Sequence, residues 1–293
     1  MENPALALLL TCLLLPAHAR AGDIDGTGLD GVTTPNTPVQ LGAKFERKLL
    51  GFDVRQERVR FTIGETGLTA STDGDGVARV SYTPTRVGVF EFTARLAERP
   101  DEAAARGKVF VVDPKRPVAV VDIDGTLSTM SSVQVLTSGE RADAFKGSPE
   151  LLEALAETHQ IVYLTARDDT LDQKTRAFLA LHAFPTGPVI YNEWGVRKTE
   201  ARAQLDPDNH GEFKLAAIEE LVRRKLKVVL GIGDAETDAE AYEGAKIRSY
   251  IRTIKAGRGA SFRFTNYQQL KVRLMLDGVL PRPKRPASRP TKR

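Results

Sequence analysis

Residues 117–127 read Pro-Val-Ala-Val-Val-Asp-Ile-Asp-Gly-Thr-Leu, and this stretch decides the fold of the second half of the chain. Residues 118–121 form an apolar, β-branched run that is too short for a helix, which predicts a buried strand. An apolar strand covered on both faces is typical of a parallel sheet. Because open α/β sheets place their chemistry beyond the carboxyl ends of the strands, we expect Asp122 and Asp124 to lie at a functional site.

The sequence around this strand alternates between strand and helix patterns, which predicts an α/β domain with a parallel sheet over residues 114–280. The expected strands are 118–121, 161–165, 189–191, 227–233 and 249–252. The expected helices are 148–157, 171–182, 212–225, 237–242 and 266–276.

Two carboxylates at this spacing suit phosphoryl chemistry. One can attack phosphorus to form an aspartyl-phosphate, and the other can protonate the leaving oxygen and later activate water. The same five residues also occur at Asp23-Ile-Asp-Gly-Thr27, but there they follow Ala-Arg-Ala-Gly instead of an apolar run. We therefore expect residues 23–27 to form a loop. Acidic turn residues are the alternative for either copy, so the flanking sequence has to carry the assignment.

Asp-x-Asp-Gly-Thr after a strand resembles motif I of the haloacid dehalogenase (HAD) phosphohydrolases. The resemblance implies that Asp122 is the nucleophile and Asp124 the general acid/base. Tyr163-Leu-Thr-Ala-Arg167 resembles motif II, where the hydroxyl and a free backbone N–H of Thr165 can hold phosphoryl oxygens. Arg167 can either clamp a phosphate or pair with the acidic residues that follow it.

A lysine that offsets the repulsion between nucleophile and phosphate is expected next in the chain. Lys214, in Phe213-Lys-Leu-Ala-Ala, resembles the motif III lysine, because a helix, a strand and an acidic segment follow it directly. Lys198 is the competing candidate.

The segment Gly231-Ile-Gly-Asp-Ala-Glu-Thr-Asp238 is another apolar strand ending in acid, and it resembles motif IV. Hard oxygen ligands suit magnesium, which keeps several waters. The resemblance implies that Mg²⁺ is held by Asp122, the backbone carbonyl of Asp124, and Asp234. Asp238 then either ligates the metal directly or orients the lysine.

The resemblance implies a Rossmann-like HAD domain. The spacing of the motifs indicates that it is capless, with an open site, since intervals of about 40 and 50 residues leave no room for a further domain. Within the superfamily, residues 117–270 resemble the lipin-type and Nir-type phosphatidate phosphatase domain. The resemblance rests on the four motifs and on Pro185-Thr-Gly-Pro-Val-Ile190. It implies phosphatidate or another lipid phosphate at a membrane surface as the substrate. Lipins usually carry Asn where Asp234 stands.

Residues 22–113 alternate apolar and polar side chains with a period of two, which predicts an all-β domain. The expected strands are 39–45, 58–63, 77–82, 88–94 and 108–112, with turns at 64–67, 73–76 and 83–85. Short strands at this spacing predict a β-sandwich, and residues 69–84 resemble bacterial immunoglobulin-like repeats. The Asp-Gly pairs favour turn chemistry over a calcium site. We expect this domain to bind, space or orient, with a partner that the sequence does not identify.

The two ends of the chain differ from its middle. Residues 1–21 resemble a secretory signal peptide, so we expect a secreted, periplasmic or cell-envelope protein. Cys12 is the only cysteine, and removal of the signal would leave none for a disulfide or a thiolate. Residues 281–293 form a basic, proline-rich tail that we expect to be disordered. The net charge of +4 comes from this tail.

Two rival functions remain open. An open site and a basic tail are also compatible with a nucleic-acid end phosphatase. The chain can also be a surface binding module that carries a relic HAD domain. The presence of both Asp122 and Asp124 argues against a relic, which need not keep its acid/base residue.

Overall fold

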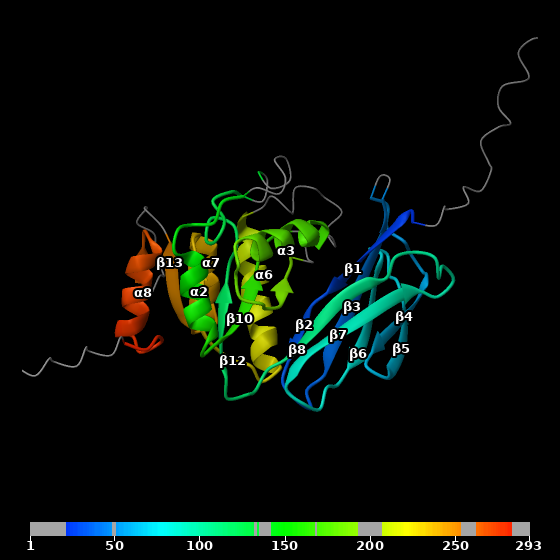
Figure 1. The fold of residues 1–293 in the computed structure, drawn as a ribbon, viewed down its shortest axis with the longest axis horizontal. Coiled ribbons are helices and arrows are strands. Elements are labelled where there is room, and N and C mark those ends of the chain that lie inside the picture. The colour runs from blue at the N-terminus through cyan, green and yellow to red at the C-terminus, as the bar shows by residue number, and fades with distance from the viewer. Residues whose placement is uncertain are drawn as a thin grey trace, which may run out of the picture.

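The computed structural model describes residues 22–48, 51–131, 134, 142–167, 169–192, 207–252 and 262–282. An all-β region precedes an α/β region in the chain, and the two lie side by side (Figure 1). Within these ranges, no helix is both long enough and apolar enough to cross a membrane. The predicted signal peptide, Lys198 and tail residues 283–293 lie outside the described residues.

Six parallel strands form the sheet of the α/β region, in the order β11-β10-β9-β12-β13-β14. They are β9 (Pro117–Val121), β10 (Gln160–Leu164), β11 (Val189–Ile190), β12 (Lys227–Gly233), β13 (Arg248–Arg252) and β14 (Phe262–Phe264). The five strands expected from the sequence are all present, and β14 is additional. The predicted parallel α/β fold is confirmed, with the 117–121 strand inside the sheet.

Helices cover both faces of this sheet. They are α2 (Ser148–Ala156), α3 (Asp172–Leu181), α6 (Pro207–Arg223), α7 (Glu236–Gly244) and α8 (Tyr267–Leu276), with a short 3₁₀ helix η1 (Asp169–Leu171) before α3. Val121 of β9 shares an apolar cluster with Leu152 of α2 and Leu270 of α8. Val120 points to the opposite face and shares a cluster with Ile218 of α6. Burial on both faces explains why the strand sequence is continuously apolar.

The all-β region consists of two sheets around one apolar cluster. Its strands are β1 (Ile24–Leu29), β2 (Gly31–Thr33), β3 (Val39–Arg47), β4 (Arg58–Ile63), β5 (Thr66–Ser71), β6 (Val77–Tyr82), β7 (Gly88–Leu96) and β8 (Ala105–Val111). One sheet has the order β1-β3-β6 and the other β2-β8-β7-β4-β5. Phe45 from the first sheet and Phe61 from the second belong to the shared cluster. The immunoglobulin-like class of this region stays a prediction.

The expectation of a loop at residues 23–27 is wrong, because most of this segment lies in β1. β1 pairs antiparallel with β3 in an unbroken register. Its sequence lacks an apolar alternation, and its glycines have a packing role instead. A Cβ at Gly28 would lie 2.3 Å from the backbone of Arg106 on β8, so only glycine permits this approach of the two sheets. Strand pairing and sheet packing therefore override the weak local pattern.

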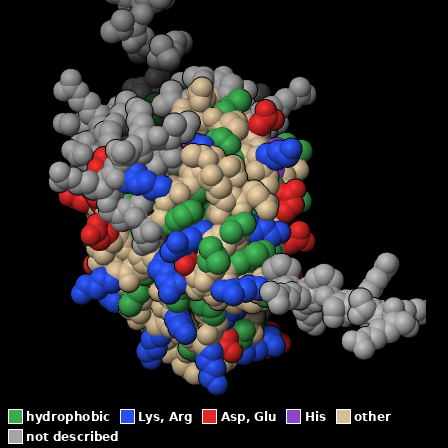
Figure 2. All heavy atoms as spheres, turned by 90° about the vertical axis from the view of Figure 1, so that its left-hand side faces the viewer, with side chains coloured by type: hydrophobic (Ala, Val, Ile, Leu, Met, Phe, Trp, Pro, Cys, Tyr) green, Lys and Arg blue, Asp and Glu red, His purple; other side chains and the backbone are tan. Residues whose placement is uncertain are grey.

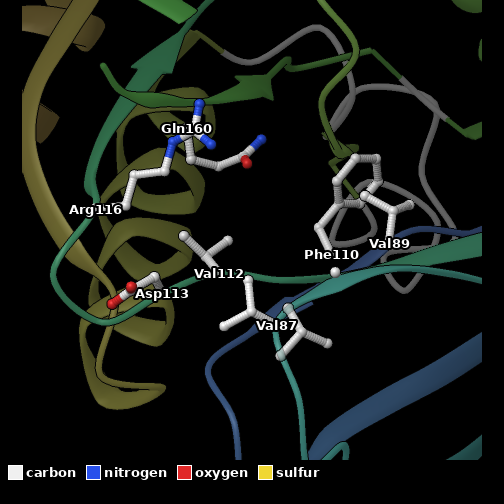
Figure 3. Close-up of a pocket in the computed structure, with 9 residues that line it drawn as sticks. Val87, Val89, Phe110, Val112, Asp113, Arg116 and Gln160 are labelled. Atoms are coloured by element: carbon white, nitrogen blue, oxygen red, sulfur yellow. The ribbon is translucent and has the colours of Figure 1, made fainter. Parts of the chain in front are cut away.

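The connection between β8 and β9 is tied to the α/β region. Arg116 donates from Nη2 to the backbone carbonyls of Ala156 and His159, at 2.7 and 3.0 Å. A shallow, mostly apolar hollow lies beside this connection (Figure 3). It is lined by Val87, Gly88, Val89, Phe110, Val111, Val112, Asp113, Arg116 and Gln160, and it contains no candidate catalytic residue.

Candidate active site

The acidic residues of motifs I and IV meet at the carboxyl edge of the sheet. Asp122 directly follows β9, and its backbone N–H donates to the carbonyl of Ile232 at 2.9 Å, which extends the pairing of β9 with β12. Asp234 directly follows β12. Since β9 and β12 are parallel neighbours, both side chains leave the sheet at the same edge, as the sequence predicts.

The turn after Asp122 packs closely against Asp234. Gly125 has a φ of 70°, and a Cβ there would lie 2.1 Å from Oδ2 of Asp234. Only glycine fits both the left-handed backbone and this distance. The buried Thr126 hydroxyl lies 3.1 Å from Oδ2 of Asp122 and 3.4 Å from Oδ1 of Asp234, and it donates toward both carboxylates.

Lys214 reaches the same cluster from α6. Its Nζ donates to Oδ1 of Asp122 at 2.8 Å and to Oδ1 of Asp238 at 2.5 Å, and all three side chains are buried. Burial alone lowers the pKa of the lysine, but the charges of the two carboxylates raise it well above its usual value. Lys214 is therefore a permanent cation beside Asp122, in the place expected for the motif III lysine.

Asp238 accepts hydrogen bonds on both of its carboxylate oxygens. Its Oδ1 accepts from Lys214, and its Oδ2 accepts from the backbone N–H groups of Asp234 and Ala235, at 3.1 and 3.0 Å. These donors lie at the start of α7, where backbone N–H groups are free to bind a carboxylate. Of the two roles that the sequence left open for Asp238, this geometry favours orienting the lysine.

The cluster is suited to a cation. One carboxylate oxygen from each of Asp122, Asp234 and Asp238 lies within 4.8 Å of the others. Burial raises the pKa of Asp122 well above its ordinary value; Lys214 lowers it, and the neighbouring carboxylates raise it further. Burial, followed by the charge of Asp238, raises the pKa of Asp234 to about 6. Mutually repelling carboxylate oxygens that are buried or partly buried fit magnesium.

Asp124 does not belong to the group of three carboxylates, and its own carboxylate pairs with an arginine. Arg167 holds both of its carboxylate oxygens, from Nε at 2.9 Å and from Nη2 at 2.8 Å, and donates from Nη1 to the hydroxyl of Thr175 at 3.0 Å. The Arg167 side chain is only 1% exposed, whereas that of Asp124 is 21% exposed. A buried arginine thus fixes a carboxylate that solvent can still reach. This pairing differs from both roles that the sequence suggested for Arg167.

Thr165 lies at the end of β10, next to the motif I strand, but one part of its expected role is wrong. Its backbone N–H is not free, because it donates to the carbonyl of Ile190 on β11 at 3.0 Å. Its hydroxyl oxygen accepts from the backbone N–H of Arg167 at 3.2 Å. The residue therefore stabilises the turn that presents Arg167, and only the hydroxyl proton remains to contact a phosphoryl group.

Two residues that the sequence gave no reason to select also support the motif I turn. Arg252, at the end of β13, donates from Nε to the carbonyl of Gly125 at 2.6 Å. Its guanidinium lies 3.8 Å from the ring centre of Phe145. Tyr267 of α8 donates its hydroxyl to the carbonyl of Thr126 at 2.6 Å. Both bonds satisfy carbonyls of the turn from distant parts of the chain, so no local motif could have indicated them.

Residues 119–253 match the family model described as "PITM 1-3, LNS2 domain". The matched segment contains the candidate site residues from Asp122 to Asp238 and also Arg252, whereas Tyr267 lies beyond it. This match supports a phosphatase domain of the HAD type. No curated protein matches the sequence.

Several solved structures resemble part of this chain in their backbone fold. A chain of the Pnkp1/Rnl/Hen1 RNA repair complex is 13% identical over 47% of this chain and 42% of its own, with a TM-score of 0.39, so this chain spans less than half of its length. The D,D-heptose 1.7-bisphosphate phosphatase from B. bronchiseptica, complexed with magnesium and phosphate, is 15% identical over 55% of this chain and 99% of its own, with a TM-score of 0.41. Invasin, a bacterial integrin-binding protein, is 17% identical over 33% of this chain and 22% of its own, with a TM-score of 0.26.

Proposed function

We propose that this chain is a magnesium-dependent phosphomonoester hydrolase that works through an aspartyl-phosphate. The observation that carries the proposal is the pair of carboxylates of motif I, which the fold places in two different environments. Asp122 is buried against Lys214, whereas Asp124 is partly exposed and held by Arg167. A nucleophile and an acid/base need this difference, since they perform different tasks.

The two carboxylates would act in sequence. In the first step an oxygen of Asp122 bonds to phosphorus, the bond from phosphorus to the ester oxygen breaks, and Asp124 gives that oxygen its proton. In the second step a water bonds to phosphorus and loses a proton to Asp124, and the bond between phosphorus and Asp122 breaks, which releases inorganic phosphate. Lys214 offsets the negative charge in both steps, and the hydroxyl of Thr165 donates to a phosphoryl oxygen.

The carboxylates of Asp122 and Asp234, together with the backbone carbonyl of Asp124, would hold the metal. Asp238 keeps Lys214 in place. Bound magnesium supplies positive charge that draws the phosphoryl oxygens toward the nucleophile and stabilises the transition state. The mutual repulsion of three carboxylates, two of them buried and that of Asp234 partly buried, supports a cation requirement, since among the contacts described above only Lys214 is a close buried counterion.

Phosphatidate, or another lipid phosphate, is the proposed substrate class. The match to the LNS2 family model supports this choice, because that family is lipin- and Nir-like, the same type that the sequence motifs resemble. The face of the molecule that carries α8 also favours an anionic surface, because lysine and arginine side chains gather there around exposed apolar ones (Figure 2). On α8 itself, Val272 and Leu276 are 48% and 61% exposed. Apolar side chains among basic ones are typical of contacts with anionic membranes. We further propose, from the N-terminal sequence alone, that the protein acts in the cell envelope or outside the cell.

The test is phosphate release by the purified protein with and without magnesium, on three substrates. These are an aryl phosphate, phosphatidate in mixed micelles, and a 3′-phosphorylated oligonucleotide. Asp122→Asn is the matched control, since it keeps the shape of the side chain and removes the nucleophile. We expect magnesium-dependent release, with phosphatidate turned over fastest.

Each other outcome has a definite meaning. No release from any of the three substrates would contradict the hydrolase proposal. Release that Asp122→Asn retains would contradict the assignment of the nucleophile. A clear preference for the oligonucleotide, weakened by salt and by removal of residues 283–293, would replace the lipid substrate by a nucleic-acid end.

A further inference from the structure

A lysine of the all-β region is buried against the phosphatase region. Lys44 lies on β3 between Ala43 and Phe45, which belong to the core of the two sheets. Because side chains alternate along a strand, Lys44 points away from that core. Its side chain is nevertheless only 4% exposed, since its Nζ meets Oδ1 of Asp169 at 3.0 Å. The same Nζ also lies 3.0 Å from Oε1 of Glu46.

The partner of Lys44 belongs to the segment that presents Arg167. Asp169 opens η1, two residues after Arg167, and its side chain is 3% exposed. Arg167 in turn holds both oxygens of Asp124. A short covalent path therefore connects the ion pair between the two regions with the arginine that orients the proposed acid/base.

A second buried contact fixes the other end of this segment. Asp30, in the connection between β1 and β2, has a fully buried side chain whose Oδ2 accepts from Nη1 of Arg176 on α3 at 2.9 Å. The same oxygen accepts from the backbone N–H of Val189 on β11 at 3.3 Å. The all-β region thus contacts the chain at Asp169, the first residue of η1, and at Arg176, just after the first turn of α3.

A buried ion pair is weak evidence for stability, because the desolvation of both charges offsets much of their attraction. We infer that Lys44 is a positioning residue for Asp124, acting through Asp169 and the turn that carries Arg167. The inference rests on the proposed phosphatase function. It makes the all-β region part of the catalytic apparatus, although none of its residues belongs to the acidic cluster.

The dependence of the rate on the leaving group separates positioning from simple stability. An alkyl phosphate expels a strongly basic oxygen that needs the proton of Asp124, whereas p-nitrophenyl phosphate expels a weakly basic one that hardly needs it. If Lys44 helps to aim Asp124, its loss slows the alkyl ester selectively. If Lys44 only stabilises the fold, both esters lose the same fraction of activity.

The experiment compares kcat and KM for n-butyl phosphate and p-nitrophenyl phosphate, with magnesium, in the wild type and in Lys44→Met/Asp169→Leu. The double variant removes both charges, so neither is left buried alone. We expect kcat/KM, which reports the step that expels the leaving group, to fall about tenfold more for n-butyl phosphate than for p-nitrophenyl phosphate. Lys48→Met is the matched control, since Lys48 is an exposed lysine just after β3; it should behave as the wild type.

Asp169→Asn serves as a milder variant if the double variant does not fold, because Lys44 retains Glu46 as a partner. It should also lose more activity on n-butyl phosphate than on p-nitrophenyl phosphate, but by a smaller factor. Equal losses of kcat/KM on both esters, or no loss in either variant, would overturn the inference while leaving the phosphatase proposal intact. No phosphate release by the wild type from either ester would instead remove the function on which the inference rests.

Discussion

The pentapeptide Asp-Ile-Asp-Gly-Thr occurs twice in this chain, mostly within strand β1 at residues 23–27 and beyond the end of strand β9 at residues 122–126. In the first copy the second aspartate is 54% exposed and lies opposite Glu46 on β3. In the second copy the first aspartate is buried against Lys214, and the second is held by Arg167. The same five residues are thus a pairing strand in one place and a charged site in the other.

The difference comes from what each copy meets. The first copy enters an antiparallel ladder, where side chains alternate between a core and an open face. The second follows a parallel strand whose neighbour, β12, ends beside it in Asp234, and Lys214 approaches from α6. The pentapeptide supplies two carboxylates and a turn, and the surrounding fold decides whether they become a site.

The largest expected contrast is between the first aspartates of the two copies. Asp122→Asn should lower kcat by more than about 10³-fold, because an amide cannot replace the nucleophile in the proposed mechanism. Asp23→Asn should leave kcat within about twofold, because Asp23 is exposed and directly precedes β1. Phosphate release measures both, with circular dichroism to establish folding. Similar losses in the two variants would remove the functional distinction between the copies.

The glycines should separate activity from stability. Gly125→Ala forces a Cβ into contact with Asp234 at a φ of 70°, so we expect roughly a 10²-fold loss of kcat. A Cβ at Gly26 lies 2.9 Å from the backbone of Ala105, in the packing between sheets. Gly26→Ala should therefore lower the free energy of unfolding by about 1–3 kcal/mol, with kcat unchanged. Steady-state kinetics and urea unfolding of both variants test this separation of activity from stability. A loss of kcat in Gly26→Ala but not in Gly125→Ala would contradict it.

Magnesium binding should depend on pH at the second copy of the pentapeptide, because that copy lies next to Asp234. Burial and the charge of Asp238 raise the pKa of Asp234 to about 6. Below that pH the carboxyl group binds a proton, which competes with magnesium. The apparent magnesium affinity should fall by up to about tenfold per pH unit as the pH drops from 6 to 5. Titration calorimetry measures this, and Asp234→Asn should bind weakly with a flatter dependence. A pH-independent affinity in the wild type would contradict the assignment.

The same raised pKa predicts how Asp234 affects stability without metal. The folded protein holds this proton more tightly than the unfolded chain, whose aspartates titrate near 3.8. Between about pH 4 and 6 the folded state therefore binds more protons, so the contribution of Asp234 to stability falls as the pH rises through this window. Urea unfolding of the wild type and of Asp234→Asn across this window, without magnesium, measures the difference. The wild type should lose stability relative to the variant as the pH increases.

Local sequence was sufficient for the elements whose pattern is long or continuously apolar. The strand at 117–121 and the helices α2, α3 and α8 were predicted close to their observed bounds, because period and burial agree in these segments, whereas α6 begins five residues before the expected start. The short or glycine-rich strands β1, β2, β5 and β14 were not predicted. β1 forms because it pairs with β3, and β14 forms because it pairs with β13. Such strands depend on partners far away in the sequence, which a local pattern does not contain.

The candidate site shows the same division. Asp122, Lys214, Asp234 and Asp238 meet as expected, because the end of a parallel strand and the start of a helix have fixed places in the fold. The partner of Arg167 was not predictable, since a long side chain can reach several acids and only the position of α3 selects Asp124. The engaged N–H of Thr165 depends in turn on β11, an edge strand of two residues.

The smallest expected contrast concerns the threonines that end the two copies. Thr126 is fully buried, and its hydroxyl donates to both Asp122 and Asp234, so Thr126→Val removes a hydrogen bond shared by two carboxylates. We expect kcat to fall by about fivefold, which corresponds to about 1 kcal/mol. Thr27 lies within β1, where valine suits a strand, so Thr27→Val should leave both kcat and stability nearly unchanged. Equal kinetic effects would mean that the hydroxyl of Thr126 does not hold the carboxylates. A loss confined to Thr126→Val, with weaker magnesium binding, would show that this shared donor contributes to the distinction between the copies.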